Sequence, residues 1–189
     1  MKRLRDIVQP GDVLCTYNRD AIVSKGIILA TGLSAVNVDG VVHDLPVSHV
    51  AICYTRRRTI EALVDGVSQG LVKDYEQSED FVIVFRPPRP KSQIREYLKV
   101  AKKRIGINYP YFQLILDLVI ILVDRIFGVD LMKKLPDFFT GIKCSELHEI
   151  AQRAAYNVET IPGVRPAYIN PRHVAESNFM TLIHVQGLE

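Results

Sequence analysis

Cys144 is the residue best suited to act as a nucleophile, because of its place in residues 141–147 (GIKCSEL). The pattern predicts a helix that begins here, and the first turn of a helix carries unpaired backbone N–H groups and the positive end of the helix dipole. That environment favours a thiolate, and a nearby N–H group can stabilise the oxyanion of an acyl intermediate. Position alone also allows an ordinary interpretation, in which Cys144 is a small buried hydrophobic side chain.

The base that activates this cysteine must come from elsewhere in the chain, which contains five histidines. His49 opens a short β-rich segment, and a strand can hold an imidazole ring still against a nucleophile. His148 is the main competitor, because it lies one helical turn after Cys144 on the same face. We interpret the remaining histidines as surface or cap residues: His43, His173 and His184.

Glu61 lies in the β-rich segment that follows His49. Neighbouring antiparallel strands bring opposite residues within reach, so a carboxylate there can fix the tautomer of a histidine. An ordinary solvent-facing glutamate has the same pattern. A zinc site from Cys144, His148 and either His43 or His49 is a weaker alternative, because the ligands lack compact spacing. The sequence therefore predicts a Cys144–His49–Glu61 triad, with no cofactor and no metal.

Five segments predict the strands that would hold the histidine and the glutamate. They are residues 11–17, 49–54, 59–64, 66–71 and 81–85. The charged turn TRRR predicts a hairpin between the second and the third. A short helix is expected over residues 21–31, and Gly32 should end it. Residues 34–46 mix Asn, Asp, Gly and Pro, and we expect a loop or insertion there.

Helices are expected in the second half of the chain. The sequence RPPRP at residues 86–90 ends the strands, because proline cannot donate to a ladder. Ser92 is the expected N-cap of a helix that reaches about residue 105, and a further helix covers residues 143–156. A short helix and a last strand over residues 181–185 follow. The elements predict an α+β fold, with a central antiparallel sheet or small barrel packed by helices.

Length, charge and cysteine content limit the class of protein. The 189 residues fit one domain over residues 1–189, and the scattered excess of 24 Lys and Arg over 21 Asp and Glu does not indicate a nucleic-acid partner. The three cysteines form no CxxC pair, which favours a reducing compartment. The N-terminus lacks the apolar core of a secretory signal, so we expect a cytoplasmic protein.

One apolar region, residues 112–139, differs from the rest of the chain. Its stretch LILDLVIILVDRIF is interrupted by two aspartates and an arginine, and it falls short of the roughly 20 residues that span a bilayer. We therefore expect a buried or partly exposed helix and no transmembrane span. Contact with lipid or a membrane surface through residues 112–139 stays open.

As an ordered set, these segments resemble the permuted members of the NlpC-type papain-like superfamily, the YiiX- and YaeF-like cysteine peptidases and amidases, with related poxvirus proteins. The matching pieces are GDVL, AIVSKGIILATG, SHVAICY, TIEAL, VFRP, NYPY, KCSEL and INPRHVAESNFM. The resemblance implies a papain-like fold in which Cys144 is the nucleophile, His49 the general base and Glu61 the group that orients the imidazole. Circular permutation is also implied, since the histidine precedes the cysteine.

We expect supporting roles for several residues outside the predicted triad. We expect Asp12, in the Gly-Asp turn, to be structural, and Tyr109 or Tyr111 to line the cleft. Residues 34–46 and 112–139 depart from the simplest pattern of the family. Both would shape substrate access, because specificity lies in loops and pockets that a family does not share.

Three functions follow as hypotheses. The first is hydrolysis of an amide bond in a small peptide or aminoacyl substrate, through a thioester on Cys144. The second is a lipid acyltransferase or thioesterase, similar to the lecithin-retinol acyltransferase family, in which residues 112–139 receive the chain of an acyl-lipid substrate. KCSEL lacks the Asn-Cys-Glu-His signature of that family, which places this hypothesis second. The third is a binding module that has lost activity.

Overall fold

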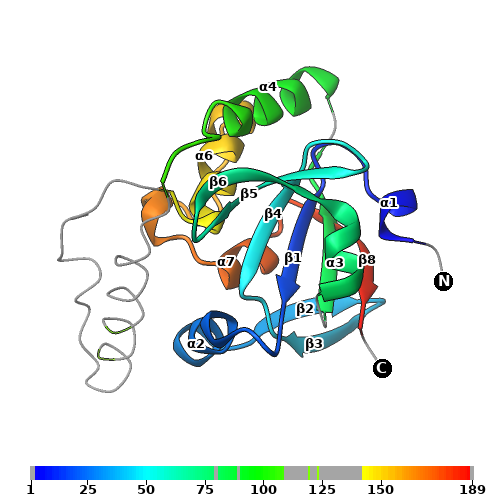
Figure 1. The fold of residues 1–189 in the computed structure, drawn as a ribbon, viewed down its shortest axis with the longest axis vertical. Helices are drawn as coiled ribbons and strands as arrows, with labels where there is room; N and C mark the ends of the chain where they lie inside the picture. The colour runs from blue at the N-terminus through cyan, green and yellow to red at the C-terminus, as the bar shows by residue number, and fades with distance from the viewer. Residues whose placement is uncertain are drawn as a thin grey trace.

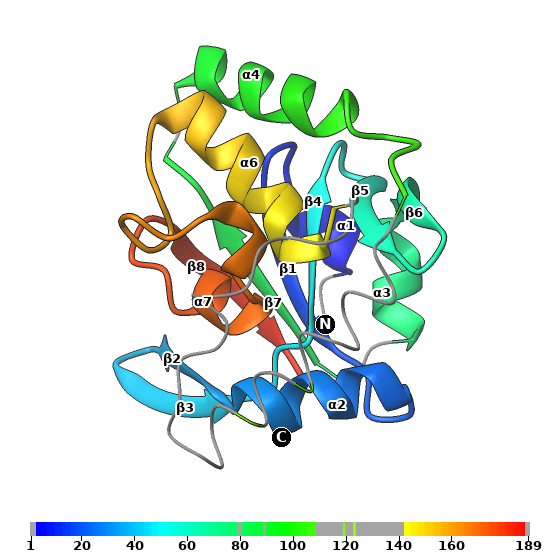
Figure 2. The same ribbon diagram turned by 90° about the vertical axis from the view of Figure 1, so that its left-hand side faces the viewer.

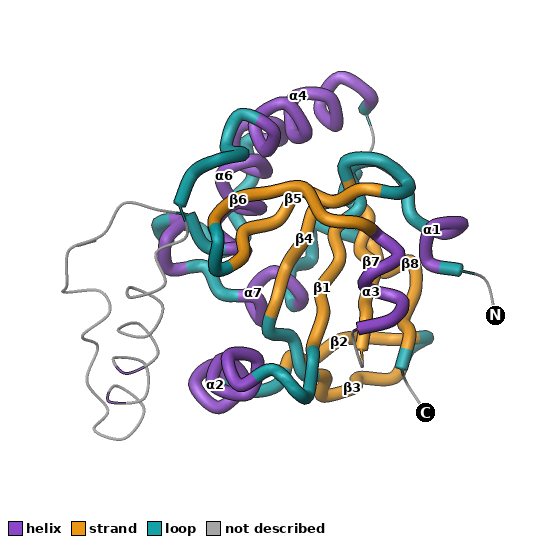
Figure 3. The backbone as a smooth tube through the Cα atoms, in the orientation of Figure 1, coloured by secondary structure: helices purple, strands orange, loops and turns teal. Residues whose placement is uncertain are grey.

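The computed structural model describes residues 3–78, 81–88, 90–108, 119, 123 and 142–187. Its centre is a six-stranded sheet in the order β6-β5-β4-β1-β7-β8, with every pair of neighbours antiparallel (Figures 1 and 3). The α+β class is therefore as predicted. The strands are β1 (Val13–Tyr17), β4 (His49–Cys53), β5 (Arg58–Leu63), β6 (Gly66–Leu71), β7 (Phe81–Arg86) and β8 (Thr181–Gln186).

Helices cover both faces of this sheet (Figure 2). One face packs against α6 (Cys144–Tyr156) and α7 (Pro171–Ala175), with α4 (Lys91–Lys102) lying on α6. The other face packs against α1 (Leu4–Ile7) and α3 (Val72–Ser78). Because both faces are covered, β1 and β7 are apolar almost throughout instead of alternating, which is why their sequences indicated strands so clearly.

Residues 34–46 form a hairpin, so the expectation of a loop is wrong. Strands β2 (Ser34–Val38) and β3 (Val41–Leu45) pair with each other beside α2 (Ile22–Thr31). The turn between them is Asp39–Gly40, and both residues have positive φ, 52° and 86°. A two-residue turn with two left-handed residues favours Asp-Gly, so this dipeptide was the signal for the hairpin.

Two further expectations about helices need correction. Ser92 is not an N-cap, because α4 begins at Lys91 with Pro90 in the capping position. Pro90 has an extended backbone (φ −84°, ψ 128°) and provides no side-chain cap, so the helix starts at the residue that follows it. Helices α1 and α3 were not predicted. They have four and seven residues, too few to display a helical period in the sequence.

Part of the sequence analysis concerns residues outside the described part of the chain. Tyr109, Tyr111 and nearly all of residues 112–139 are among them, so the helix expected there stays a prediction. Within the described residues, no helix has the length and apolar character needed to cross a bilayer.

Asp12 has the structural role that its turn predicted. Its carboxylate is fully buried and accepts hydrogen bonds from Arg86 Nε at 2.9 Å and from the second Arg86 nitrogen at 2.7 Å. The Gln9 N–H donates to the same carboxylate at 2.8 Å, and the Arg86 guanidinium also donates to the Ile7 carbonyl at 3.3 Å. The ion pair therefore fastens the N-terminal segment and the start of β1 to the end of β7.

We expect Arg86→Leu to lower the free energy of unfolding by about 3–5 kcal/mol, because it leaves Asp12 buried without its counter-charge. Urea denaturation measures this. The control is Arg3→Ala, which removes an exposed ion pair with Asp6 and should cost less than about 1 kcal/mol. Equal stability of the two variants would contradict the role given to Asp12.

Candidate active site

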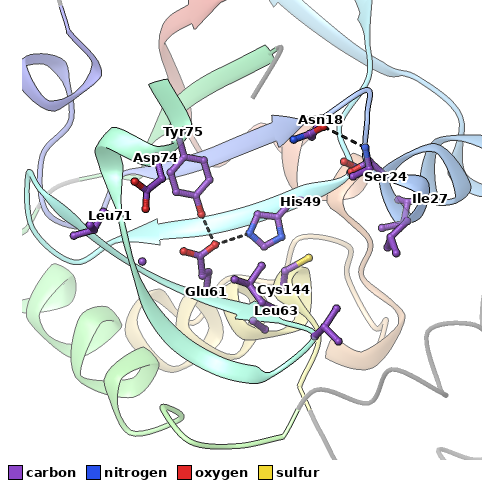
Figure 4. A pocket seen from close by; sticks show the side chains of 16 residues that line it. Asn18, Ser24, Ile27, His49, Glu61, Leu63, Leu71, Asp74, Tyr75 and Cys144 are labelled. Atoms are coloured by element: carbon purple, nitrogen blue, oxygen red, sulfur yellow. Dashed lines mark hydrogen bonds and ion pairs between the residues drawn. The ribbon is translucent and has the colours of Figure 1, made fainter. Parts of the chain in front are cut away.

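The structure brings the three predicted site residues together in one pocket of about 490 Å³ (Figure 4). Cys144 is the first residue of α6, His49 is the first of β4, and Glu61 lies within β5. The His49 ring lies between the Glu61 carboxylate and Cys144 (Figure 4). The side chains that could carry acyl chemistry therefore share one cavity, although Cys144 is far from the other two in the sequence.

The start of α6 gives the Cys144 sulfur an environment that favours the thiolate. The side chain is only 6% exposed, and burial by itself opposes ionisation. Hydrogen bonding and charge attraction from His49 outweigh burial, and backbone hydrogen bonds from Val50 and Ser145 add to them, so that the pKa of Cys144 is lowered. Cys15 and Cys53 differ, because burial raises the pKa of both thiols.

His49 connects the sulfur to the carboxylate. Its Nε2 lies 3.1 Å from Glu61 Oε2, which leaves Nδ1 as the ring nitrogen available to Cys144. Burial disfavours the imidazolium, but hydrogen bonds to Cys144 and Glu61, with the charges of both, raise the pKa of His49 to about 10. Both pKa shifts favour a thiolate on Cys144 beside an imidazolium on His49.

Strand register explains why Glu61 reaches the ring. In the pairing of β4 with β5, Ala51 lies opposite Glu61. His49 is two residues from Ala51, so its side chain emerges on the same face of the sheet, diagonal to Glu61. Diagonal neighbours are about 7–8 Å apart at Cα, a separation that two long side chains can bridge.

Three neighbours hold the Glu61 carboxylate in place. Thr59 Oγ1 donates to Glu61 Oε1 at 2.9 Å, and the Tyr75 hydroxyl donates to Oε2. Burial disfavours the charge of Glu61, but hydrogen bonds from His49, Tyr75 and Thr59 lower its pKa. A Cβ atom at Gly70 would lie 1.9 Å from Oε1, so glycine at this position leaves the space that the carboxylate fills.

The sequence analysis missed these supporting residues. Thr59 and Glu61 are two apart in a predicted strand, which puts both on one face, and a glycine within a strand can mark a close approach. Those two signals could have been used. Tyr75 gave none, since it belongs to the unpredicted helix α3.

His148 lies in the core and not at the sulfur. It is 1% exposed, and its Nδ1 lies 2.6 Å from the Tyr97 hydroxyl, with the two rings edge to face. Burial lowers its pKa to about 4, so it is neutral at physiological pH. The structure therefore favours His49 over His148 as the partner of Cys144.

Metal binding and similarity to known proteins add no further assignment. Among the described residues, no group of three or more His, Cys, Asp and Glu side chains could hold a metal ion. No protein-family model matches this chain, and no curated protein matches it. The geometry of the site is therefore the basis for its chemistry.

We expect Cys144 to react with iodoacetamide at least tenfold faster than Cys15 or Cys53 near neutral pH, because only its pKa is lowered. A thiol loses its thiolate form as the pH falls below its pKa. Because the pKa of Cys144 is lowered, its reaction should persist at pH values below those at which an ordinary thiol stops reacting. His49→Ala should shift its acid limb to higher pH. Peptide mapping after brief alkylation measures each rate, and equal labelling of the three thiols would contradict the assignment.

Gly70→Ala should shift the same alkylation profile to higher pH. The new methyl group displaces Glu61, the pKa of His49 falls without the carboxylate, and the thiolate loses stabilisation. The matched control is Gln69→Ala on the same strand, whose exposed side chain accepts a hydrogen bond from Arg58. If both variants keep the wild-type profile while folded, Glu61 does not govern the ionisation of Cys144.

Proposed function

We propose that this protein is a cysteine hydrolase that cleaves an amide bond, in a peptide or aminoacyl substrate, through a thioester on Cys144. The observation that carries the proposal is the position of the His49 ring, bonded to Glu61 at 3.1 Å and facing Cys144 in a shared pocket. A nucleophile, its base and a group that orients the base form an arrangement typical of covalent acyl transfer.

The reaction begins with attack of the Cys144 thiolate on the carbonyl carbon of the substrate. A C–S bond forms, and the carbonyl oxygen becomes an oxyanion that the N–H groups at the start of α6 can stabilise. The His49 imidazolium gives its proton to the leaving nitrogen, the C–N bond breaks, and an amine departs from the thioester.

Water completes the cycle. The neutral His49 ring removes a proton from water, and the resulting hydroxide attacks the thioester carbonyl. The C–S bond then breaks, the carboxylic acid product leaves, and the thiolate is restored beside the imidazolium. Through both halves, Glu61 acts on the ring and not on the substrate, since it holds the Nε2–H and balances the charge of the ring.

The arrangement of the elements supports a permuted papain-like fold as part of this proposal. A helix with cysteine at its start packs on an antiparallel sheet, and two neighbouring strands of the sheet carry the histidine and the acid. The strands precede the helix along the chain, which is the order that permutation would produce.

A second candidate is a thioesterase or acyltransferase that uses the same three residues. The observation that favours it is the lining of the pocket, where apolar side chains outnumber charged ones. The leaving group would then be an alcohol or a thiol, and the acceptor either water or a second substrate. The acyl-enzyme on Cys144 is common to both candidates.

Substitutions at Cys144 and Glu61 distinguish the role of the nucleophile from the role of the group that orients His49. Cys144→Ala should abolish turnover, because no thioester can form. Glu61→Gln keeps an acceptor for the ring N–H but removes the charge, so it should lower kcat at least tenfold while activity stays measurable. Acyl-amide and acyl-ester libraries, scored by turnover and by the mass of acylated protein, provide the measurement.

Each outcome of this experiment has a definite meaning. Faster turnover of amides supports the first candidate, and faster turnover of long-chain esters supports the second. Turnover by Cys144→Ala equal to that of the wild type would overturn both candidates. A Glu61→Gln variant as active as the wild type would reduce the triad to a pair of Cys144 and His49.

A further inference from the structure

The pocket that contains Cys144 has a wall whose chemistry the reaction itself does not require. Apolar side chains come from two separate places, helix α2 and the hairpin turn that joins β5 to β6. Val23 and Ile27 belong to the helix, and Leu63 and Val64 belong to the end of β5 and to the turn. An apolar wall inside a concave site is a typical place for an apolar part of a ligand to bind.

Besides the His49 ring, which already interacts with Glu61 and Cys144, no side chain with positive charge lines the same pocket among the described residues. Glu61 and Asp74 are its acidic residues. Glu61 is already committed to His49, Thr59 and Tyr75. A carboxylate or phosphate on the acyl part of a substrate would therefore find no lysine or arginine among the described residues that line the pocket.

The reaction geometry indicates which part of the substrate lies on the apolar wall. His49 protonates the leaving group, so the leaving group must lie on the His49 side of the sulfur. The acyl group stays on the sulfur and occupies the opposite side. In Figure 4, Ile27 of α2 lies on the side of the Cys144 sulfur away from the His49 ring.

We propose that the acyl part of the substrate is apolar and uncharged, and that it packs between α2 and the turn that joins β5 to β6. This inference rests on the proposed acyl-enzyme and adds its acyl specificity. It holds for an amide and for an ester, because the wall contacts the acyl group and not the leaving group. Burial of each methylene group on such a wall favours binding and raises kcat/KM.

A series of p-nitrophenyl esters tests this proposal on the full chain. The acyl groups are acetyl, butyryl and hexanoyl, with succinyl as the charged analogue of butyryl, and the rate with Cys144→Ala is subtracted. We expect kcat/KM to rise by about two- to fourfold per added methylene group. We also expect the succinyl ester to be at least tenfold slower than the butyryl ester.

Substitutions on α2 show whether this wall is responsible. Val23 is half-buried and lines the pocket, so Val23→Asp should reduce the ratio of hexanoyl to acetyl kcat/KM toward one. Ile22→Asp is the matched control, because Ile22 is the preceding residue, is 85% exposed and lies outside the lining. It should keep the wild-type ratio. Ile27→Ala removes apolar contact without introducing a charge, and it should also reduce the ratio of hexanoyl to acetyl kcat/KM. Thermal unfolding verifies that each variant is folded.

The results distinguish failure of this inference from failure of the proposed function. Turnover that depends on Cys144 but is indifferent to chain length, or faster with succinyl, overturns the acyl specificity alone. A wild-type ratio in both Val23→Asp and Ile27→Ala overturns the assignment to this wall. Absence of any turnover that depends on Cys144 overturns the proposed function, and the specificity with it.

Discussion

The contact between Glu61 and His49 is the interaction on which the rest of the site depends. A carboxylate that is 5% exposed is costly to ionise unless its oxygens receive hydrogen bonds. Here both oxygens are bonded, Oε1 by Thr59 and Oε2 by Tyr75 and His49. The negative charge of the Glu61 carboxylate raises the pKa of His49, and the positive charge of the His49 ring lowers the pKa of Cys144. Ionisation is thus transmitted from a buried acid to the sulfur.

This chain of contacts needs elements from both layers of the molecule. Cys144 belongs to the buried cluster between the sheet and α6, whereas Tyr75 belongs to the cluster between the sheet and α3. His49 stands where they meet, at the first residue of β4. A sheet covered on one face only would supply the nucleophile or the support for the acid, but not both.

The same burial that makes the charges costly also makes their interactions strong. Attraction between charged groups is larger where water is scarce, so the thiolate and the imidazolium stabilise each other more than they would on an open surface. Apolar residues of α2 and of the turn between β5 and β6 line the same pocket. In the function proposed above, the wall would thereby serve two purposes, since it would hold an apolar acyl group and keep the reacting groups dry.

The sequence by itself determined the local elements and the residue types. The apolar runs that indicated β1 and β7, the hairpin of β4 and β5, and the placement of Cys144 at a helix start all follow from patterns within about 15 residues. Glycine and proline fixed several boundaries. Residues 34–46 form a hairpin and not the expected loop, because the Asp-Gly turn determines their structure despite their polar composition.

Only the tertiary structure decided which of these residues meet. Cys144 lies on a helix far along the chain from His49, and the strand position that favoured His49 left His148, which is closer in sequence, as a competitor. Packing decided it, because His148 turns into the core against Tyr97 while strand register aims His49 at Glu61. Tyr75 and Gly70 belong to the site for the same reason. Their roles depend on contacts between segments that the chain brings together only when folded, and such contacts leave no periodic signal in the sequence.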